Sequence, residues 1–546
     1  MGKHILVIIP ARGNSKGIPR KNLRALNGKP LIYYSITNAL SSIYNPDVFV
    51  SSDDEEIINI ALKIGAQIIR RESRLAQDAT TLDPVIYDGY LQAKEITNKS
   101  YDLIITLQPT SPLLQTASLD AAIARMLEKS EIDTILSAIE DKHLTWGKVG
   151  EHYIPNFSER LNRQYLPDNY KETGGFLITR PAIISENNRI GKRVDLHLLN
   201  GEEAIDIDNF VDWNICTYYL KRKRIVFVIT GYHEVGLGHA YRGLNVANEI
   251  LDHEIIFLVD SKSEEAFKLI ARNNYKVFKQ EQADLLDDLN KLNPDVIIND
   301  RLDTSEPYMQ ALLDKKYLCI NFEDLGSGHS LAHLTINALY QDGVNHGHVV
   351  FGSKYVILRQ EFELSRTKVL KELEEVLITF GGIDPNNFTE KVLKSIYPLC
   401  YDAGINIKII AGLGYKHYDQ LPNLKGVEVL RNVKNISAHM LEADLAFTSG
   451  GRTTYELASL GIPTIVICQN ERELTHKFAA PENGFLQLGL GSNLNDADII
   501  NAFTKMTDVE VRKDMHDKML SKKLLQGKQH VIDLIQSKIA SFNYEQ

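Results

Sequence analysis

The sequence predicts an α/β protein in which parallel sheets are covered by helices. Short apolar runs alternate with amphipathic stretches along the whole chain, which is the pattern of strand–helix–strand units. Several of the apolar runs pass directly into glycine-rich loops, and such loops form the ligand-binding turns of these sheets. The chain has 546 residues. Because one hydrophobic core cannot serve a chain of this length, about two to four domains are expected.

The first part of the chain contains five expected strands, with a helix between the first two. The strands are residues 5–9, 48–51, 67–69, 103–107 and 134–138, and the helix is 31–41. A helix at 212–220 ends in the basic run KRKR, after which an apolar strand and a glycine-rich loop begin again. This restart predicts a domain boundary near residue 222, giving domains 1–222 and 223–546.

The second part is expected to divide into lobes of about 223–365 and 366–546. The expected strands of the first lobe are 225–229, 254–258, 296–299 and 318–321. The second lobe begins near Glu375 with VLITFGG and continues with strands 407–410, 427–430, 445–448 and 464–467. Two doubly wound lobes in tandem favour a GT-B-like region with a nucleotide cleft between the lobes.

Composition excludes several classes of protein. The net charge of −10 argues against general nucleic-acid binding. Four cysteines without a C-x-x-C pair fit a reducing compartment and neither a disulfide framework nor a zinc site. The apolar run at the N-terminus is too short for a signal segment, and no stretch reaches the roughly 18 apolar residues of a membrane span. A cytoplasmic enzyme is therefore expected.

The loop after the first strand has the features of a phosphate-binding device. Its sequence, PARGNSKGIPRKN, contains Gly13 and Gly17, which allow the backbone N–H groups to face an anion. It also contains four cations: Arg12, Lys16, Arg20 and Lys21. These charges would neutralise a polyphosphate and stabilise a leaving pyrophosphate. The alternative interpretation is a solvated basic loop.

This loop and five later motifs resemble the CMP-sialic acid synthetase family of cytidylyltransferases over nearly all of residues 1–220. The later motifs are VSSDDEEI (50–57), RRESRLAQDATTLDPVI (70–86), LQPTSPLL (107–114), RQYLPDNYKETGGFLITR (163–180) and IDIDNFVDW (205–213). One departure is Glu72, which stands where the family usually has proline. The resemblance implies a Rossmann-like nucleotidyltransferase domain. Its substrates would be CTP and a nonulosonic acid, whose anomeric oxygen attacks the α-phosphate while pyrophosphate leaves.

The resemblance also implies roles for individual residues. Arg12 and Lys21 would be catalytic and hold the triphosphate, with Gly13 and Asn22 beside them. The remaining positions are Arg71 near the base or the acceptor, Gln108 near the nucleotide and the sugar, and Arg163 and Gln164 in the acceptor-binding segment. An arginine has an electrostatic reason to meet the carboxylate of a sugar acid. The resemblance further implies a homodimer formed through this domain.

Two acidic residues are the expected metal ligands of the first domain. In a strand, Asp206 and Asp208 would present both carboxylates on one side, because side chains alternate with period two. By resemblance they bind Mg²⁺, which neutralises the triphosphate and polarises the α-phosphate, with Asp212 as a possible helper. The alternative is a solvated strand end. Asp53 and Asp54 fit either a site role or a cap on the following helix.

The glycine-rich loop of the second part, GYHEVGLGHAYR (231–242), precedes an expected helix. Gly236 and Gly238 allow close approach of a ligand to the helix N-terminus. His239 and Arg242 lie one turn apart and face the same way. Histidine is the natural general base near neutral pH, although a lone histidine is usually structural.

Further motifs at expected strand ends point to a nucleotide-sugar cleft. IINDRLDTSEPY (297–308), YVILRQEF (355–362), FGGIDPNNFT (380–389) and QNERELTH (469–476) are polar strings at such positions. In FTSGGRTTYELASLG, Gly450, Gly451 and Thr453 would hold diphosphate at a helix start, and Glu456 would accept from ribose hydroxyls. Gly238 and Arg242, together with Asn470 and Glu471, are the expected substrate contacts.

These strings resemble the UDP-2,4-diacetamido-2,4,6-trideoxy-β-L-altropyranose hydrolases of pseudaminic acid biosynthesis, over about residues 225–530. The resemblance implies a GT-B fold in which His239 activates water and UDP leaves. A departure is TGYHEV, where the family often has an R-x-D-x-S-like stretch. Other readings of this half are a hydrolysing UDP-sugar 2-epimerase, a glycosyltransferase, or a non-catalytic module that binds a UDP-sugar. The expected partners of the whole chain are CTP, a nonulosonic acid and a UDP-sugar.

Overall fold

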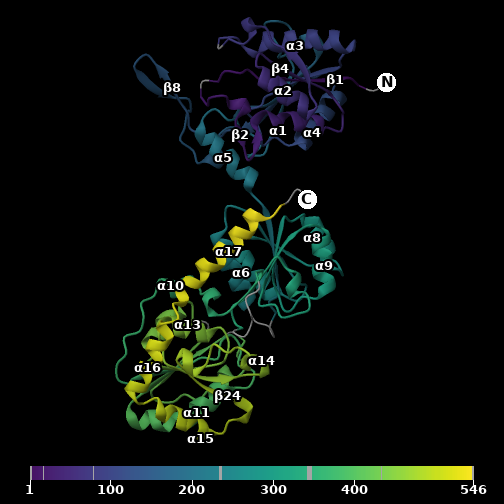
Figure 1. The fold of residues 1–546 in the computed structure, drawn as a ribbon. Helices are drawn as coiled ribbons and strands as arrows, with labels where there is room; N and C mark the ends of the chain where they lie inside the picture. The colour runs from purple at the N-terminus through teal and green to yellow at the C-terminus, as the bar shows by residue number, and fades with distance from the viewer. Residues whose placement is uncertain are drawn as a thin grey trace. The chain divides into compact units, whose positions relative to one another are not determined.

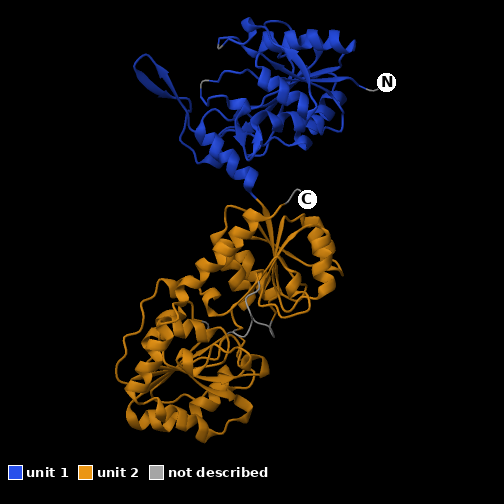
Figure 2. Ribbon diagram, in the orientation of Figure 1, with its two compact units in different colours: residues 1–222 blue, residues 223–546 orange. Residues whose placement is uncertain are grey.

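A computed structural model describes residues 3–15, 17–77, 79–232, 237–340, 347–412, 414–431 and 433–543. The chain forms two compact units, Met1–Arg222 and Lys223–Gln546 (Figure 2). Each unit is built from open sheets flanked by helices (Figure 1). The α/β class expected from the alternating pattern is confirmed.

The first unit is organised around a seven-stranded sheet of order β11-β7-β10-β6-β1-β4-β5. The strands are β1 (Ile5–Pro10), β4 (Asp47–Ser52), β5 (Gln67–Arg70), β6 (Leu103–Leu107), β7 (Thr134–Glu140), β10 (Tyr170–Thr179) and β11 (Val194–Leu198). All five strands expected from the sequence are present. β10 is antiparallel to both of its neighbours, β6 and β7, so the sheet is mixed and not wholly parallel as expected.

Helices cover both faces of this sheet. They are α1 (Leu31–Leu40), α2 (Glu55–Ile64), α3 (Leu82–Thr97), α4 (Thr116–Glu128) and α5 (Phe210–Lys221). The apolar residues of α1, α2 and α4 share one core cluster, whereas those of α3 belong to the cluster on the other face. α2 begins where Asp54 accepts hydrogen bonds from Glu56 N and Ile57 N at 2.8 and 3.2 Å. The capping role foreseen for Asp54 is therefore confirmed.

The first lobe of the second unit has a seven-stranded, wholly parallel sheet of order β14-β13-β12-β15-β16-β17-β18. Its strands are β12 (Arg224–Ile229), β13 (Glu254–Val259), β14 (Lys276–Lys279), β15 (Val296–Asp300), β16 (Leu318–Phe322), β17 (Leu334–Asn337) and β18 (Val349–Phe351). Its helices are α6 (Gly238–Glu249), α7 (Glu264–Arg272), α8 (Leu285–Leu292) and α9 (Glu306–Asp314).

The second lobe has a six-stranded parallel sheet of order β21-β20-β19-β22-β23-β24. Its strands are β19 (Glu375–Ile378), β20 (Asn406–Ala411), β21 (Val427–Arg431), β22 (Leu445–Thr448), β23 (Thr464–Cys468) and β24 (Phe485–Leu490). The helices that follow the link between lobes are α10 (Gln360–Glu363), α11 (Phe388–Ala403), α12 (Ile436–Glu442), α13 (Thr453–Leu460), α14 (Glu471–Leu474), α15 (Asp496–Lys505) and α16 (Val509–Leu520).

The last helix, α17 (Gly527–Ser541), returns to the first lobe (Figure 1). Its residues Val531, Ile532, Ile535 and Ile539 are buried in the first lobe's core. Two doubly wound lobes joined in this way make the second unit GT-B-like, as expected. Among the described residues, no helix has both the length and the apolar character needed to cross a membrane. The four cysteines are free and buried.

Candidate active sites

The carboxyl edge of the first unit's sheet gathers the predicted nucleotide loop and the acidic turn after β4. Gly13, just beyond β1, donates its N–H to Asp53 Oδ1 at 3.0 Å. A Cβ on Gly13 would lie 2.7 Å from Asp54 Oδ2, so only glycine allows the loop to approach the turn this closely. Arg71, after β5, is buried and donates to Ser51 O at 2.6 Å. Burial lowers its pKa to about 10, so it remains charged at neutral pH.

The second half of the loop holds Lys21 and Asn22 in a short 3-10 helix, Lys21–Leu23. Asn22 Nδ2 donates to Arg12 O at 3.0 Å and ties the two ends of the loop together. Lys21 Nζ donates to Ile207 O at 2.6 Å, which brings the lysine to the aspartate segment. Burial lowers the pKa of Lys21, while Asp208 and Asp206 oppose that shift. Lys16 lies outside the described residues.

Residues 205–207 have no regular secondary structure and residues 208–209 form a bend, so the aspartate segment is not the strand that its alternating pattern suggested. Ile207 N donates to Thr110 O at 2.8 Å, and the backbone N–H of Asp208 donates to Asp212 Oδ2 at 2.9 Å. Asp212 and Asn209 form a capping box that starts α5. α5 begins at Phe210 with Asn209 as its N-cap, so the segment leads directly into a helix. Asp212 caps this helix through Oδ2, and its helper role at the metal stays a prediction.

Asp206 has the properties expected of a metal-binding carboxylate. Burial raises its pKa, and its buried Oδ1 has no hydrogen-bond partner among the described residues. A Cβ on Gly174 would lie 2.8 Å from this oxygen, so the glycine in β10 makes room for the carboxylate. A buried oxygen left open beside an exposed second carboxylate, Asp208, suits a hard cation such as Mg²⁺.

The site alone offers few ligands. Within the described ranges, no group of three or more His, Cys, Asp or Glu side chains is placed to hold a metal ion. Mg²⁺ characteristically uses one or two carboxylates and takes its other ligands from phosphates and water. The pair Asp206 and Asp208 therefore fits Mg²⁺ bound together with a nucleotide.

The other predicted site residues of the first unit make fewer hydrogen bonds to the rest of the protein. Gln108 follows β6, and its N–H donates to Gly175 O at 3.4 Å. Arg163 and Gln164 lie exposed on the 3-10 helix Arg163–Tyr165, and their side chains have no hydrogen bond to any described residue. The acceptor role implied for these two remains a prediction.

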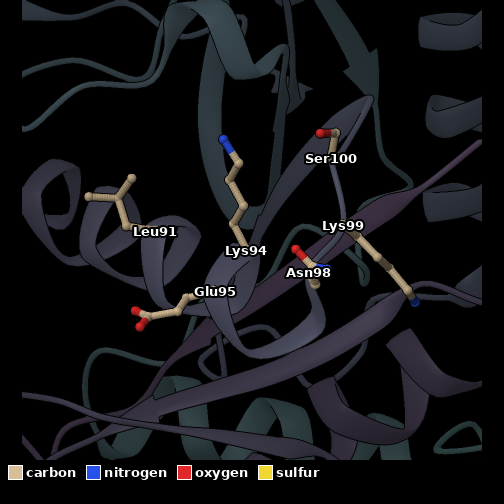
Figure 3. Close-up of a pocket in the computed structure, with 6 residues that line it drawn as sticks. All are labelled: Leu91, Lys94, Glu95, Asn98, Lys99 and Ser100. Atoms are coloured by element: carbon tan, nitrogen blue, oxygen red, sulfur yellow. The ribbon is translucent and has the colours of Figure 1, made fainter.

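A surface pocket of about 360 Å³ opens at the C-terminal end of α3 (Figure 3). It is lined by Leu91, Lys94, Glu95, Asn98, Lys99 and Ser100. Because these residues lead into the amino end of β6, the pocket lies at the edge of the sheet opposite to the loop of Gly13. It is therefore separate from the nucleotide site.

In the second unit, His239 and Asp300 form a dyad. His239 is the second residue of α6, and its Nδ1 lies 2.6 Å from Asp300 Oδ1. Asp300 is the fully buried last residue of β15. Burial would raise its pKa, but Arg242 and then His239 lower it to about 2. The ionised carboxylate keeps the proton of the neutral imidazole on Nδ1 and leaves Nε2 as the basic atom.

Arg242 braces this dyad from the next turn of α6. Its Nε donates to Asp300 Oδ2 at 2.7 Å, and its Nη1 donates to Glu323 Oε1 at 3.0 Å. Arg242 is only 4% exposed, so its guanidinium serves the two carboxylates. Its predicted contact with substrate stays a prediction. Gly236 lies outside the described residues.

A glutamate that the sequence did not single out accepts hydrogen bonds from the glycine loop of the second lobe. Glu473, on α14, accepts from Gly450 N at 3.0 Å and from Gln469 N at 2.7 Å. Burial raises its pKa. A Cβ on Gly450 would lie 3.1 Å from both Cys468 Sγ and Glu473 O, which is a tight contact. Gly451 follows in this loop, and Thr453 begins α13.

Glu456, the predicted ribose acceptor on α13, is paired with an arginine of the L-R-Q-E-F string. Arg359 Nη2 lies 3.0 Å from Glu456 Oε1, and burial raises the pKa of Glu456. Asn470 caps α14 by accepting from Glu473 N at 3.1 Å, and Glu471 is exposed. Substrate contacts for Asn470 and Glu471 stay predictions.

Residues 6–152 match the family model described as Cytidylyltransferase. Over 231 residues the chain is 30% identical to post-translational flagellin modification protein B of Campylobacter coli, covering 40% of this chain and 97% of that protein. The chain belongs to the cytidylyltransferase family. The family match lies in the first unit, which holds the Lys21 and Asp206 site.

A second relative of the cytidylyltransferase unit is the pseudaminic acid cytidylyltransferase of Campylobacter jejuni, 44% identical over 124 residues, which are 22% of this chain and 53% of that protein. The chain spans 56% of an uncharacterized protein of Methanocaldococcus jannaschii and 50% of N-acylneuraminate cytidylyltransferase A of Danio rerio. Among solved structures, MurG of Acinetobacter baumannii aligns with 58% of this chain and 99% of its own, at 14% identity and a TM-score of 0.42.

Proposed function

We propose that the chain is a bifunctional enzyme of nonulosonic acid biosynthesis. Its first unit converts CTP and a pseudaminic-type nonulosonic acid into the CMP-sugar and pyrophosphate. Its second unit hydrolyses UDP-2,4-diacetamido-2,4,6-trideoxy-β-L-altropyranose to UDP and the free sugar. The relatives named for flagellin modification and for pseudaminic acid support the substrate class of the first unit.

The observation that carries the transferase half is the open oxygen of Asp206 next to Lys21. Lys21 and Arg12 would bind the triphosphate, and Lys21 is oriented by its bond to Ile207 O. The anomeric oxygen of the acid forms a bond to the α-phosphorus as the bond to pyrophosphate breaks, and the proton of the anomeric hydroxyl passes to solvent. Asp206 and Asp208 would hold Mg²⁺, which supplies charge neutralisation and polarises the α-phosphate when bound.

Pyrophosphate release from CTP tests this half. We expect release with pseudaminic acid and Mg²⁺, and none when the metal is chelated. Asp206→Ala and Asp208→Ala should each abolish CMP-sugar formation. Full activity in both variants would overturn the metal assignment while leaving the family membership intact.

The observation that carries the hydrolase half is the dyad of His239 and Asp300. Nε2 of His239 would take a proton from water as the water oxygen attacks the anomeric carbon, and Asp300 would stabilise the imidazolium that forms. UDP leaves with the electron pair of the broken bond. UDP release in water alone separates hydrolysis from transfer to an acceptor. His239→Ala should lose this release of UDP, whereas a module that only binds the UDP-sugar would not depend on His239 for any reaction.

A homodimer formed through the first unit and a cytoplasmic location complete the proposal. The hairpin of β8 (Trp146–Val149) and β9 (His152–Pro155) exposes large apolar side chains, with Tyr153 68% and Trp146 53% exposed. Apolar surface of this kind is typical of an interface. Light scattering of the intact chain tests the dimer, and a monomer at micromolar concentration would contradict it.

A further inference from the structure

The boundary between the two lobes of the second unit contains three arginines that differ in whether a carboxylate forms an ion pair with them. Arg242 is bound by Asp300 and by Glu323. Arg359 pairs with Glu361 and with Glu456, at 3.1 and 3.0 Å. Arg452 forms no ion pair with any carboxylate in the described part of the chain. The one hydrogen bond that its side chain makes there is from Nη2 to Ile357 O at 2.9 Å.

Arg452 lies between the two halves of the candidate hydrolase site. In sequence it joins Gly451 to Thr453, so it stands at the entrance to α13. In space its Cδ would lie 3.5 Å from a Cβ on Gly238, and Gly238 is the residue before His239. One side chain therefore spans the glycine loop of the second lobe and the dyad of the first.

The guanidinium of Arg452 is partly buried, and within the described residues no carboxylate contacts it directly. Burial and the neighbouring Arg242 lower the pKa of Arg452 to about 10, so the side chain is still a cation at neutral pH. The carboxylates of Asp300, Glu456 and Glu323 lie near enough to oppose this shift, but none of them forms an ion pair with Arg452. A cation removed from water costs free energy unless an anion pairs with it. The N–H groups at the start of α13 also favour an anion. The planar fork of an arginine matches the oxygens of a phosphate.

We propose that Arg452 is a catalytic residue of the second unit that binds the β-phosphate of a nucleoside diphosphate. The inference rests on the UDP-sugar site proposed above. When the bond between the anomeric carbon and the β-phosphate oxygen breaks, its electron pair stays on that oxygen. Arg452 neutralises the charge that develops there, while the proton of the attacking water passes to His239. Its interaction thus strengthens as the bond breaks, which is how such a group lowers a barrier.

Binding of UDP and of UMP to the intact chain, measured by calorimetry, tests the assignment, because only UDP has a β-phosphate. Arg452→Gln should weaken UDP binding by more than about tenfold and UMP binding far less. Arg452→Lys should retain part of the preference for UDP. Arg272→Gln, an exposed arginine on α7, is the matched control and should bind both nucleotides as the wild type does.

The possible results separate this assignment from the proposed function. If the wild type binds UDP and Arg452→Gln binds it equally well, the role of Arg452 is refuted and the nucleotide site stands. If both nucleotides are weakened equally, Arg452 is structural. If the wild type binds no UDP, the nucleotide site and this inference both fail.

Because Arg452 has no carboxylate partner among the described residues, its replacement should also leave the melting temperature unchanged or higher. A large drop together with an unchanged UDP-to-UMP ratio would again indicate a structural residue.

Discussion

The substitution Asp300→Asn tests whether the buried dyad works as the geometry indicates. An asparagine keeps the shape of Asp300 but presents an N–H₂ group and one neutral oxygen. In the wild type, the carboxylate of Asp300 accepts hydrogen bonds from Nε and Nη2 of Arg242 at 2.7 and 2.5 Å. It also lies 2.6 Å from Nδ1 of His239. The amide can satisfy only part of this set, and it no longer holds the imidazole in one tautomer.

The structure sets the size of the expected loss of stability. The pKa of Asp300 is lowered from 3.8 to about 2, and each unit corresponds to about 1.4 kcal/mol. Charge on Asp300 therefore stabilises the folded state by roughly 2 kcal/mol. Because its pKa is depressed, this contribution is complete above pH 3.8 and is lost as the pH falls through about 2. Asp300→Asn should lower the free energy of unfolding by roughly 2 to 4 kcal/mol at neutral pH.

The effect on turnover should be larger than the effect on stability. Loss of the orienting carboxylate in a comparable His–Asp pair costs a factor of about 10⁴ in kcat, so a loss of about 10³ to 10⁴ in UDP release is expected. Asp303→Asn is the matched control, since Asp303 is exposed and, among the described residues, accepts a hydrogen bond only from Leu325 N. If Asp300→Asn releases UDP within about threefold of wild type while His239→Ala is inactive, the positioning role of Asp300 is refuted.

Three further predictions concern the first unit. Asp206→Asn should reduce CMP-sugar formation by more than about a hundredfold, yet leave the melting temperature unchanged, because burial already disfavours the charged form; an active variant would contradict the metal site. Gly174→Ala places a methyl group 2.8 Å from the carboxylate of Asp206 and should slow the same reaction about 10- to 100-fold, whereas Gly201→Ala, with nothing within 4 Å, should be neutral. Trp146→Asp should convert a dimer to a monomer in light scattering, and an unchanged mass would remove the hairpin from the interface.

The strands of both units could be predicted because each is a short apolar run bounded by glycine or polar residues. β1 and β15 are buried throughout or nearly so, and such strands are recognised by composition alone. β10 could not be placed in the same way, because its first half, YKETG, is polar and partly exposed. Its antiparallel pairing to β6 and β7 depends on contacts distant in sequence.

Residue pairs in the candidate sites were predicted where both residues lie on one helix and were not predicted where they come from separate elements. His239 and Arg242 could be paired from their spacing on a helix. Their shared partner Asp300 could not, because it comes from β15, whose register beside β12 sets Ile229 opposite Asp300. The alternating pattern around Asp206 suggested a strand, but the capping residues Asn209 and Asp212 start a helix at once and outweigh it.

The bifunctional assignment is tested most directly by one experiment on the intact chain. UDP-2,4-diacetamido-2,4,6-trideoxy-β-L-altropyranose is incubated in water without an acceptor, and UDP is followed by phosphorus NMR. The account predicts rapid release of UDP by the wild type and none by His239→Ala. Absence of release by the wild type would contradict the hydrolase half and leave only the CTP-dependent activity of the first unit.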